Sequence, residues 1–229
     1  IGEDGTGTVN GYSIGPGANL YGAILEFSDL TGADLSGAIL YSANLLDSIL
    51  INADLSGADL SFADLTDARL IGANLINADL SGADLSFADL SNADLPFVNL
   101  RGAILEFANL SGASLTGVIS GNINGTPTLP SGYQMINGYI VGAGVDLTGA
   151  DLTGADLTGA NLEGADLSGA DLSGADLRDA LLAGTIWSNV ISQSDYDAVV
   201  AERDAALAAQ ATAEAERDAK LTLDEVKDL

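Results

Sequence analysis

The amino-acid sequence predicts an all-β solenoid followed by a C-terminal α-helical segment, and three observations carry this prediction. Leucine recurs at every fifth position from Leu20 to Leu115 and again from Leu147 to Leu182. In the first run, the residue two positions before each leucine is small and usually alanine, with Val98 as the one larger side chain. Toward the C-terminus this five-residue period ends, and an alanine-rich tract of helix-forming residues follows.

Composition and charge exclude several classes of function. The chain has 229 residues, 33 of them acidic and 7 basic, and carries a formal net charge of −26 without any His or Cys. Disulfides, thiolate nucleophiles, imidazole bases and Cys- or His-ligated metals are therefore excluded. Phosphate binding needs clustered basic residues, so no direct nucleic-acid binding is expected. No run of 18 apolar residues occurs, so no membrane span is predicted.

The first element is a leader or cap at residues 1–17, which runs into N-G-Y-S-I-G-P-G-A-N-L at residues 10–20. An Asn-Gly pair between β-forming residues is a strong hairpin signal, here over Val9–Tyr12. We expect a capping strand or hairpin that lies over the first coil and covers its exposed edge. The alternative is a linker without a capping role.

The second element is the repeat at residues 18–117, and its period fits neither a helix nor a plain strand. A short extended segment followed by a turn resets the direction of the chain every five residues. Leu and the small residue two positions earlier then share the inward face. Gly, Asn, Asp and Ser fill the remaining positions, and these residues tolerate turn geometry.

The pattern A-(D/N)-L-x-x resembles the pentapeptide-repeat family, over about residues 18–117 and 145–184. This resemblance implies a right-handed quadrilateral β-helix with four repeats in each coil. The first run then makes about five coils, and the second run, at residues 145–190, about two. Because two coils bury little surface, we expect the second run to stack on the first.

Residues 118–144 separate the two runs. Two Pro and several Gly in residues 118–136 predict a surface loop. A second leader, N-G-Y-I-V-G-A-G-V-D-L at residues 137–147, repeats the first at an offset of 127 positions. It predicts another Asn-Gly hairpin over Ile136–Tyr139.

The last element, residues 191–229, is predicted to be an alanine-rich α-helical tail. Its small residues are spaced alternately by three and four, which is typical of a coiled-coil seam. The tract A-E-R-D-A resembles spacer segments in large repetitive surface proteins of marine bacteria. We interpret the seam as a candidate self-association surface; the alternatives are docking on the solenoid or exposure to solvent. Its alanines are Ala198, Ala201, Ala205, Ala208, Ala215 and Ala219.

Aspartate before leucine supplies much of the acidity, and in a 20-residue coil these side chains form columns such as Asp34, Asp54, Asn74 and Asp94. The first interpretation is that they bond backbone amides at turns. The second is that the columns bind Ca²⁺ through oxygen ligands. We predict no cofactor, with Ca²⁺ as the alternative.

Aromatic and aliphatic side chains at outward positions form the candidate protein-contact surface. A 20-residue coil stacks them in pairs, and exposed apolar patches often mark partner contacts. The alternative is that the leaders, the loop and the tail pack on these positions. The residues are Tyr21, Tyr41, Ile51, Ile71, Phe87 and Phe107.

We predict a non-enzymatic structural module, a scaffold or spacer in an extracellular or surface protein that mediates protein contacts. A convex rod without His or Cys offers no shaped catalytic site. The chain opens on Ile1 and its only Met is Met135, which indicates a processed or trimmed product. A removed signal peptide and a fragment of a longer protein both fit this. We expect a secreted or cell-surface protein, with a cytoplasmic location as the alternative. Some pentapeptide-repeat proteins mimic DNA and inhibit gyrase, so a DNA-mimic regulator is the second function.

Overall fold

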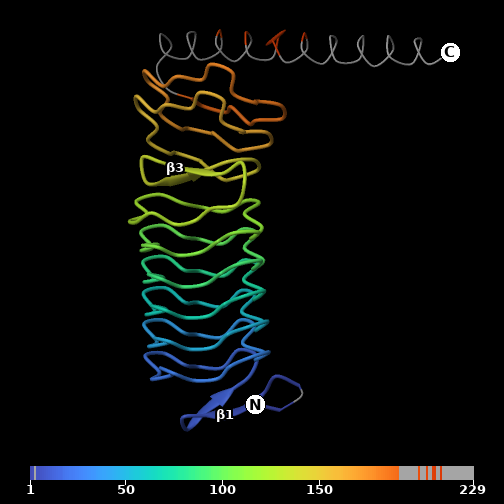
Figure 1. The fold of residues 1–229 in the computed structure, drawn as a ribbon, viewed down its shortest axis with the longest axis vertical. Coiled ribbons are helices and arrows are strands. Elements are labelled where there is room, and N and C mark those ends of the chain that lie inside the picture. The colour runs from blue at the N-terminus through green and yellow to red at the C-terminus, as the bar shows by residue number, and fades with distance from the viewer. Residues whose placement is uncertain (3, 191–200, 202–204, 206–207, 210–211, 213–229) are drawn as a thin grey trace, which may run out of the picture.

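The computed structural model describes residues 1–2, 4–190, 201, 205, 208–209 and 212. These residues build a rod of stacked coils, with the N-terminus at one end (Figure 1). Parallel bridges join residues 20 positions apart, from Asn19 with Ile39 through Asn99 with Ile119. Each coil of the first run therefore consists of four five-residue repeats, and the predicted all-β solenoid is confirmed.

Each corner of the coil is a tight turn between a leucine and the small residue three positions later. The Ala23 amide, for example, donates to the Leu20 carbonyl at 3.0 Å. The second corner residue has a positive φ, 59° at Gly22, which is the geometry of a type II turn. Glycine and asparagine adopt it at low cost, so the sequence places them there.

The core is a column of leucines lined by small residues. Leu65 is fully buried and Ala63 is 1% exposed, and the same holds along both runs. Because the two inward residues of a repeat lie on the same face of a short extended segment, the hydrophobic pattern of the sequence sets the direction of every side chain.

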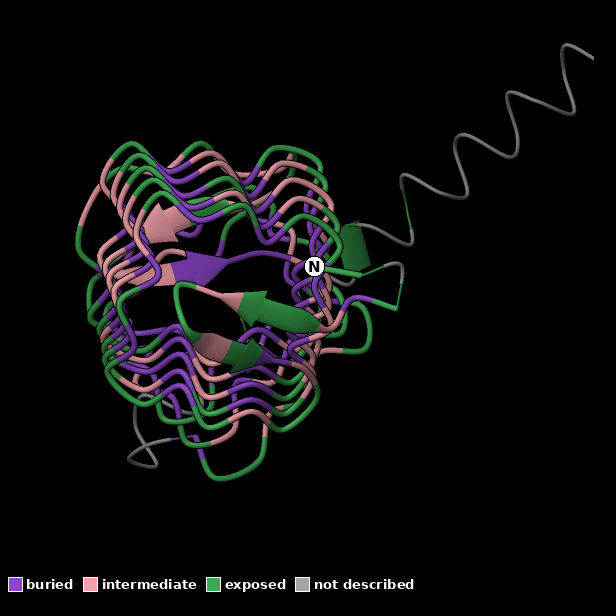
Figure 2. Cartoon of the chain, turned by 90° about the horizontal axis from the view of Figure 1, so that it is seen from below, coloured by how far each residue is buried: buried purple, intermediate pink, exposed green. Residues whose placement is uncertain are grey.

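A hairpin closes the N-terminal end of the rod. It consists of β1 (Gly7–Val9) and β2 (Tyr12–Ile14), paired antiparallel around Asn10 and Gly11. Figure 2, seen along the rod from this end, shows a hairpin lying across the opening of the coil. The Tyr12 hydroxyl accepts a hydrogen bond from the Ile24 amide at 3.3 Å. The first leader is thus the predicted hairpin and covers the edge of the first coil.

The segment after the first run differs from the prediction. Residues 118–128 do not form a surface loop, because they continue the coil. Asn124 pairs with Ile104, and Thr128 pairs with Asn109 at an offset of 19 instead of 20. Val118 is fully buried and Ile123 is 8% exposed. Val118 and Ile123 point inward here, although leucine no longer recurs at every fifth position.

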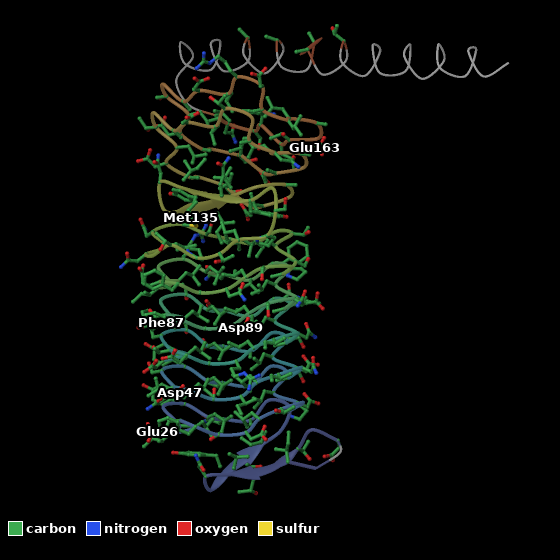
Figure 3. The ribbon with its side chains drawn as sticks, in the orientation of Figure 1. Glu26, Asp47, Phe87, Asp89, Met135 and Glu163 are labelled. Carbon is green, nitrogen blue, oxygen red and sulfur yellow. The ribbon has the colours of Figure 1, made fainter. Side chains whose placement is uncertain are left out.

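The second leader lies between the two runs. It forms β3 (Gln134–Ile136) and β4 (Tyr139–Val141), paired antiparallel around Asn137 and Gly138 as predicted. Figure 1 shows β3 within the stack, and Figure 3 labels Met135 at the same level. A parallel bridge joins Ile119 to Asp146, so the two runs form one stack.

The predicted C-terminal helix lies largely outside the described residues. Ala201, Ala205, Ala208, Ala209 and Thr212 have helical backbone and are exposed. The residues between them are not described, and the helical segment as a whole stays a prediction. In the part of the chain that the structure describes, no helix is long and apolar enough to cross a membrane.

Candidate functional site: exposed aromatic side chains on the first run

All five phenylalanines of the chain occupy the second corner position, where φ is positive. Their φ angles run from 54° to 61°, and their side chains are 54–67% exposed. A bulky residue in this region is an outlier that costs about 1–3 kcal/mol. Neither backbone preference nor burial accounts for this placement, and such outliers point to function. The residues are Phe27, Phe62, Phe87, Phe97 and Phe107.

The aromatic rings stack along the rod. The ring centroids of Tyr21 and Tyr41 are 5.4 Å apart at an interplanar angle of 6°, and those of Tyr41 and Phe62 are 5.6 Å apart. These three rings form a continuous strip over three coils. On the next corner, the Phe87 and Phe107 centroids are 5.4 Å apart. The predicted pairing of the two tyrosines and of these two phenylalanines is therefore present.

Glycine in the next coil makes room for two of these rings. A Cβ added at Gly82 would lie 2.7 Å from Cε1 of Phe62, and one at Gly117 would lie 2.4 Å from Cδ1 of Phe97. Each ring therefore lies close against the corner glycine of the following coil. A methyl group at either glycine would displace the ring above the corner.

The isoleucines of the predicted surface behave differently. Ile51 and Ile71 are only partly exposed, so they contribute less apolar surface than the rings. Ile24 and Ile39, which the sequence reasoning did not select, are 56% and 43% exposed. Both occupy the outward position before leucine, where Asp or Asn is usual, and that substitution was the signal in the sequence.

Carboxylates share a corner of the rod with some of the rings. One corner of the first run carries, coil by coil, Phe27, Asp47, Asp67, Phe87 and Phe107. Figure 3 shows Asp47 and Phe87 on the same edge of the rod, above Glu26. The Asn44 side-chain amide donates to a Glu26 carboxylate oxygen at 3.1 Å. The surface therefore combines exposed ring faces with negative charge.

Aspartates before leucine bond the turn that follows them. The Ser56 amide, for example, donates to Oδ1 of Asp54 at 2.9 Å. At Asp29, the Thr31 hydroxyl and then its amide hold the pKa of the carboxyl below its usual value. The Ser173 hydroxyl and amide do the same for the pKa of Asp171. Turn building is thus a sufficient reason for these carboxylates.

Some of the predicted columns are joined by hydrogen bonds. The side-chain amide of Asn74 donates to Asp54 at 3.1 Å, and that of Asn99 donates to Asp79 at 3.0 Å. Among the described residues, no group of three or more Asp or Glu is placed to hold a metal ion. Calcium binding by the columns stays a prediction.

A hollow beside the junction of the two runs offers little for catalysis. Its lining includes Phe97 and Val145, and its titratable side chains are Asp146 and Asp166. Each of these carboxylates accepts the amide of its own turn, from Thr148 at 2.8 Å and from Ser168 at 2.9 Å. Neither carboxylate has an acid–base partner in the hollow.

The predicted self-association seam lies mostly outside the described residues. Ala198, Ala215 and Ala219 are not described, whereas Ala201, Ala205 and Ala208 are described and exposed. Self-association through this seam stays a prediction.

The repeats identify the family. The model of the pentapeptide repeats matches eight copies, over residues 18–57, 48–86, 58–96, 83–119 and 143–190. The chain therefore belongs to the pentapeptide-repeat family. A comparison with curated proteins finds no match.

Solved structures of the same family resemble the chain. A pentapeptide-repeat protein of the Arabidopsis thaliana thylakoid lumen is 39% identical, with a TM-score of 0.40 over 41% of this chain and 66% of that one. HetL of Nostoc sp. PCC 7120, described as involved in heterocyst differentiation regulation, is 38% identical, with a TM-score of 0.32 over 77% and 75% of the two chains. The fluoroquinolone resistance protein QnrB1 is 18% identical, with a TM-score of 0.40 over 72% and 91%.

Proposed function

We propose that the chain is a non-enzymatic structural module, a stiff rod that presents an aromatic and acidic surface to a protein partner. The observation that carries this proposal is the placement of every phenylalanine at an exposed corner with positive φ. Glycine at these corners would be better for the fold. A selected contact is a reason for phenylalanine to be there instead.

The two runs have different roles in this proposal. The exposed phenylalanines and Tyr21 all belong to the first run, whereas residues 145–184 contain no Phe, Tyr or Trp. The first run is the contact surface, and the second run is a spacer that lengthens the rod. The setting that we propose is a secreted or cell-surface protein.

The chemistry of the surface fits an arginine-bearing segment of the partner. A guanidinium group stacks on aromatic faces and pairs with carboxylates, whereas an ammonium group is more strongly hydrated and stacks less well. Phe87 and Phe107 offer stacked faces on the same corner as Asp47 and Asp67. Residues 1–191 hold 23 acidic and 3 basic side chains, which attracts a basic segment from a distance.

A double substitution separates binding from stability. F87G/F107G places the preferred residue at two corners, so the unfolding free energy is expected to stay level or rise. Binding of an arginine-rich peptide, followed by calorimetric titration at physiological salt, is expected to weaken at least about fivefold, since two stacked contacts are lost. N77G/N92G is the matched control, because it changes two corner residues that are not aromatic.

The proposal predicts that the peptide binds the parent chain and the control equally, and binds the double variant more weakly. Equal binding by all three chains would show that the aromatic surface does not bind the peptide. Binding of a lysine-rich peptide as tight as that of the arginine-rich peptide would reduce the contact to net charge alone.

The alternative, a DNA-mimic regulator of an enzyme such as gyrase, has less support. Its main argument is the acidic rod, and the turn bonds of the aspartates already give that acidity a structural reason. A gyrase supercoiling assay tests it directly. Inhibition at micromolar concentrations of the chain would favour mimicry over the scaffold.

A further inference from the structure

The two leaders form the same hairpin at equivalent places. The Tyr12 hydroxyl accepts the Ile24 amide at 3.3 Å, and the Tyr139 hydroxyl accepts the Asp151 amide at 3.1 Å. Both pairs of positions differ by 127, the offset of the two leaders in the sequence. Each hairpin therefore sits on the first coil of its own run in the same way, with its tyrosine turned toward that run.

The opposite face of each hairpin carries a different pair of side chains. Because side chains alternate along a strand, the residues next to the tyrosine face away from the run that follows. In the first hairpin this pair is Thr8 and Ser13, and both are exposed. In the second it is Met135, which is partly buried, and Ile140, which is fully buried.

The surface under the second hairpin is the end of the first run. The Ile140 amide donates to Oγ of Ser120 at 3.0 Å, and the Ile123 amide donates to the Gly138 carbonyl at 3.0 Å. Gly121 is also needed, since a Cβ there would lie 2.9 Å from Cε1 of Tyr139. A small acceptor side chain followed by glycine thus receives the hairpin.

The end of the second run repeats the end of the first at an offset of 67. The Ile119 amide donates to Val98 and the Ile186 amide donates to Ala165, both at 2.9 Å. The Val118 and Thr185 amides each donate to the leucine carbonyl three positions earlier. At this equivalent end, however, Trp187 stands in place of Ser120, and Ser188 in place of Gly121.

Both replacements oppose docking of a hairpin. Trp187 offers only an N–H donor where the Ile140 amide needs an acceptor. Ser188 has the Cβ that would collide with the tyrosine ring of the hairpin. Trp187 itself packs partly buried against the core, so it covers the end of the second run.

We propose that these positions decide whether coil stacks join or end. Met135 and Ile140 form a joining surface. This surface receives the end of a pentapeptide-repeat run, provided that the end carries Ser and Gly at the positions of Ser120 and Gly121. Thr8 and Ser13 terminate the rod at one end, and Trp187 with Ser188 terminates it at the other. A polar outer face on a terminal repeat keeps a solenoid from extending.

Two variants of the full chain test the joining surface from its two sides. M135T/I140S gives the second hairpin the residues of the first, and S120W/G121S gives the first run the end of the second. Trp187 is the only tryptophan of the parent chain, and its fluorescence follows the second run, while far-UV circular dichroism follows the whole solenoid. M135L/I140V is the control that keeps the surface apolar.

The parent chain and the control are expected to melt with one midpoint by both signals. In M135T/I140S, the Trp187 midpoint is expected to fall at least about 5 °C below the circular-dichroism midpoint, because the short second run loses its support. S120W/G121S adds a second tryptophan, so fluorescence no longer follows the second run alone. In this variant, separate melting of the two runs is measured as two transitions in calorimetry. Coincident, single transitions in both variants would overturn the proposal, as would separate melting in the control.

Discussion

Leu65 and Ala63 show how little volume one repeat places inside the coil. Both are buried, and the coils above and below repeat them. The adjoining inward residues are again Leu and Ala, each buried in its own position, so none is free to fill the space left by a missing leucine. The cost of a truncation is therefore set by the cavity that remains.

Leu65→Ala is expected to lower the unfolding free energy by about 2–5 kcal/mol, the range for buried leucines. Urea unfolding followed by circular dichroism measures this change. Thr66→Ala, at the adjoining corner position, is the control and is expected to stay within about 0.5 kcal/mol of the parent chain. A cost below that of the control would mean that the coil collapses onto the truncated site.

The turn-bonded aspartates predict acid sensitivity. The Arg178 side chain and amide lower the pKa of Asp176 to about 2, and Ser173 lowers the pKa of Asp171. A carboxyl whose pKa is lower in the folded state stabilises the fold above its unfolded pKa, and this stabilisation is lost as the pH falls through the folded pKa. The stabilisation that these two carboxylates give is therefore expected to be lost between about pH 4 and pH 2, and it is measured as a difference in melting temperature from a variant that does not titrate there.

Asp171→Asn provides the matched control for this acid sensitivity. Asparagine retains a carbonyl acceptor for the turn but does not titrate. The variant is expected to lose less melting temperature than the parent chain over the same pH interval. Equal changes of melting temperature in the parent chain and the variant between pH 5 and pH 2 would contradict the assignment.

At the scale of the element, the hairpins show what was readable in the sequence and what was not. Asn10-Gly11 and Asn137-Gly138 are explicit turn signals, and both hairpins formed where the dipeptides stand. The coil at residues 118–128 was missed because its inward residues are Val and Ile without a leucine beat. A skipped residue also shifts the register, so that Thr128 pairs at an offset of 19.

The surface was predictable in part for a similar reason. Residue spacing showed which rings stack, because a coil of 20 residues fixes the column of each side chain. Residue spacing could not show whether the rings are exposed, because the leaders, the loop or the tail could each pack on them. The exposed phenylalanines and their positive φ are facts of the three-dimensional turn.

Tyr12→Phe tests the N-terminal hairpin as a cap. The substitution removes the acceptor of the Ile24 amide at the edge of the first coil. The unfolding free energy is expected to fall by about 0.5–1.5 kcal/mol, as for a typical lost hydrogen bond. Tyr21→Phe is the control, because it removes an exposed hydroxyl and keeps the ring in its stack with Tyr41. Equal effects of the two substitutions on the unfolding free energy would show that this hydrogen bond does not stabilise the cap.

At the scale of the whole molecule, the rod holds its charge at regular spacing. Residues 1–191 carry 23 acidic against 3 basic side chains, and acidic positions stack from coil to coil, as Asp59 does on Asp79. Adjacent strands lie about 4.8 Å apart, well within the screening length of about 8 Å at physiological salt. Like charges at this spacing repel along the length of the rod.

Salt is therefore expected to stabilise this fold. Raising sodium chloride from about 0.15 M to 1 M shortens the screening length to about 3 Å and should raise the melting temperature. D59N/D79N is the matched variant, since asparagine keeps the carbonyl oxygen that accepts the Ser61 and Ser81 amides. With less repulsion to screen, the variant should melt higher than the parent chain at low salt and gain less from added salt. Equal salt gains in the two chains would show that salt acts on the hydrophobic core and not on the carboxylate columns.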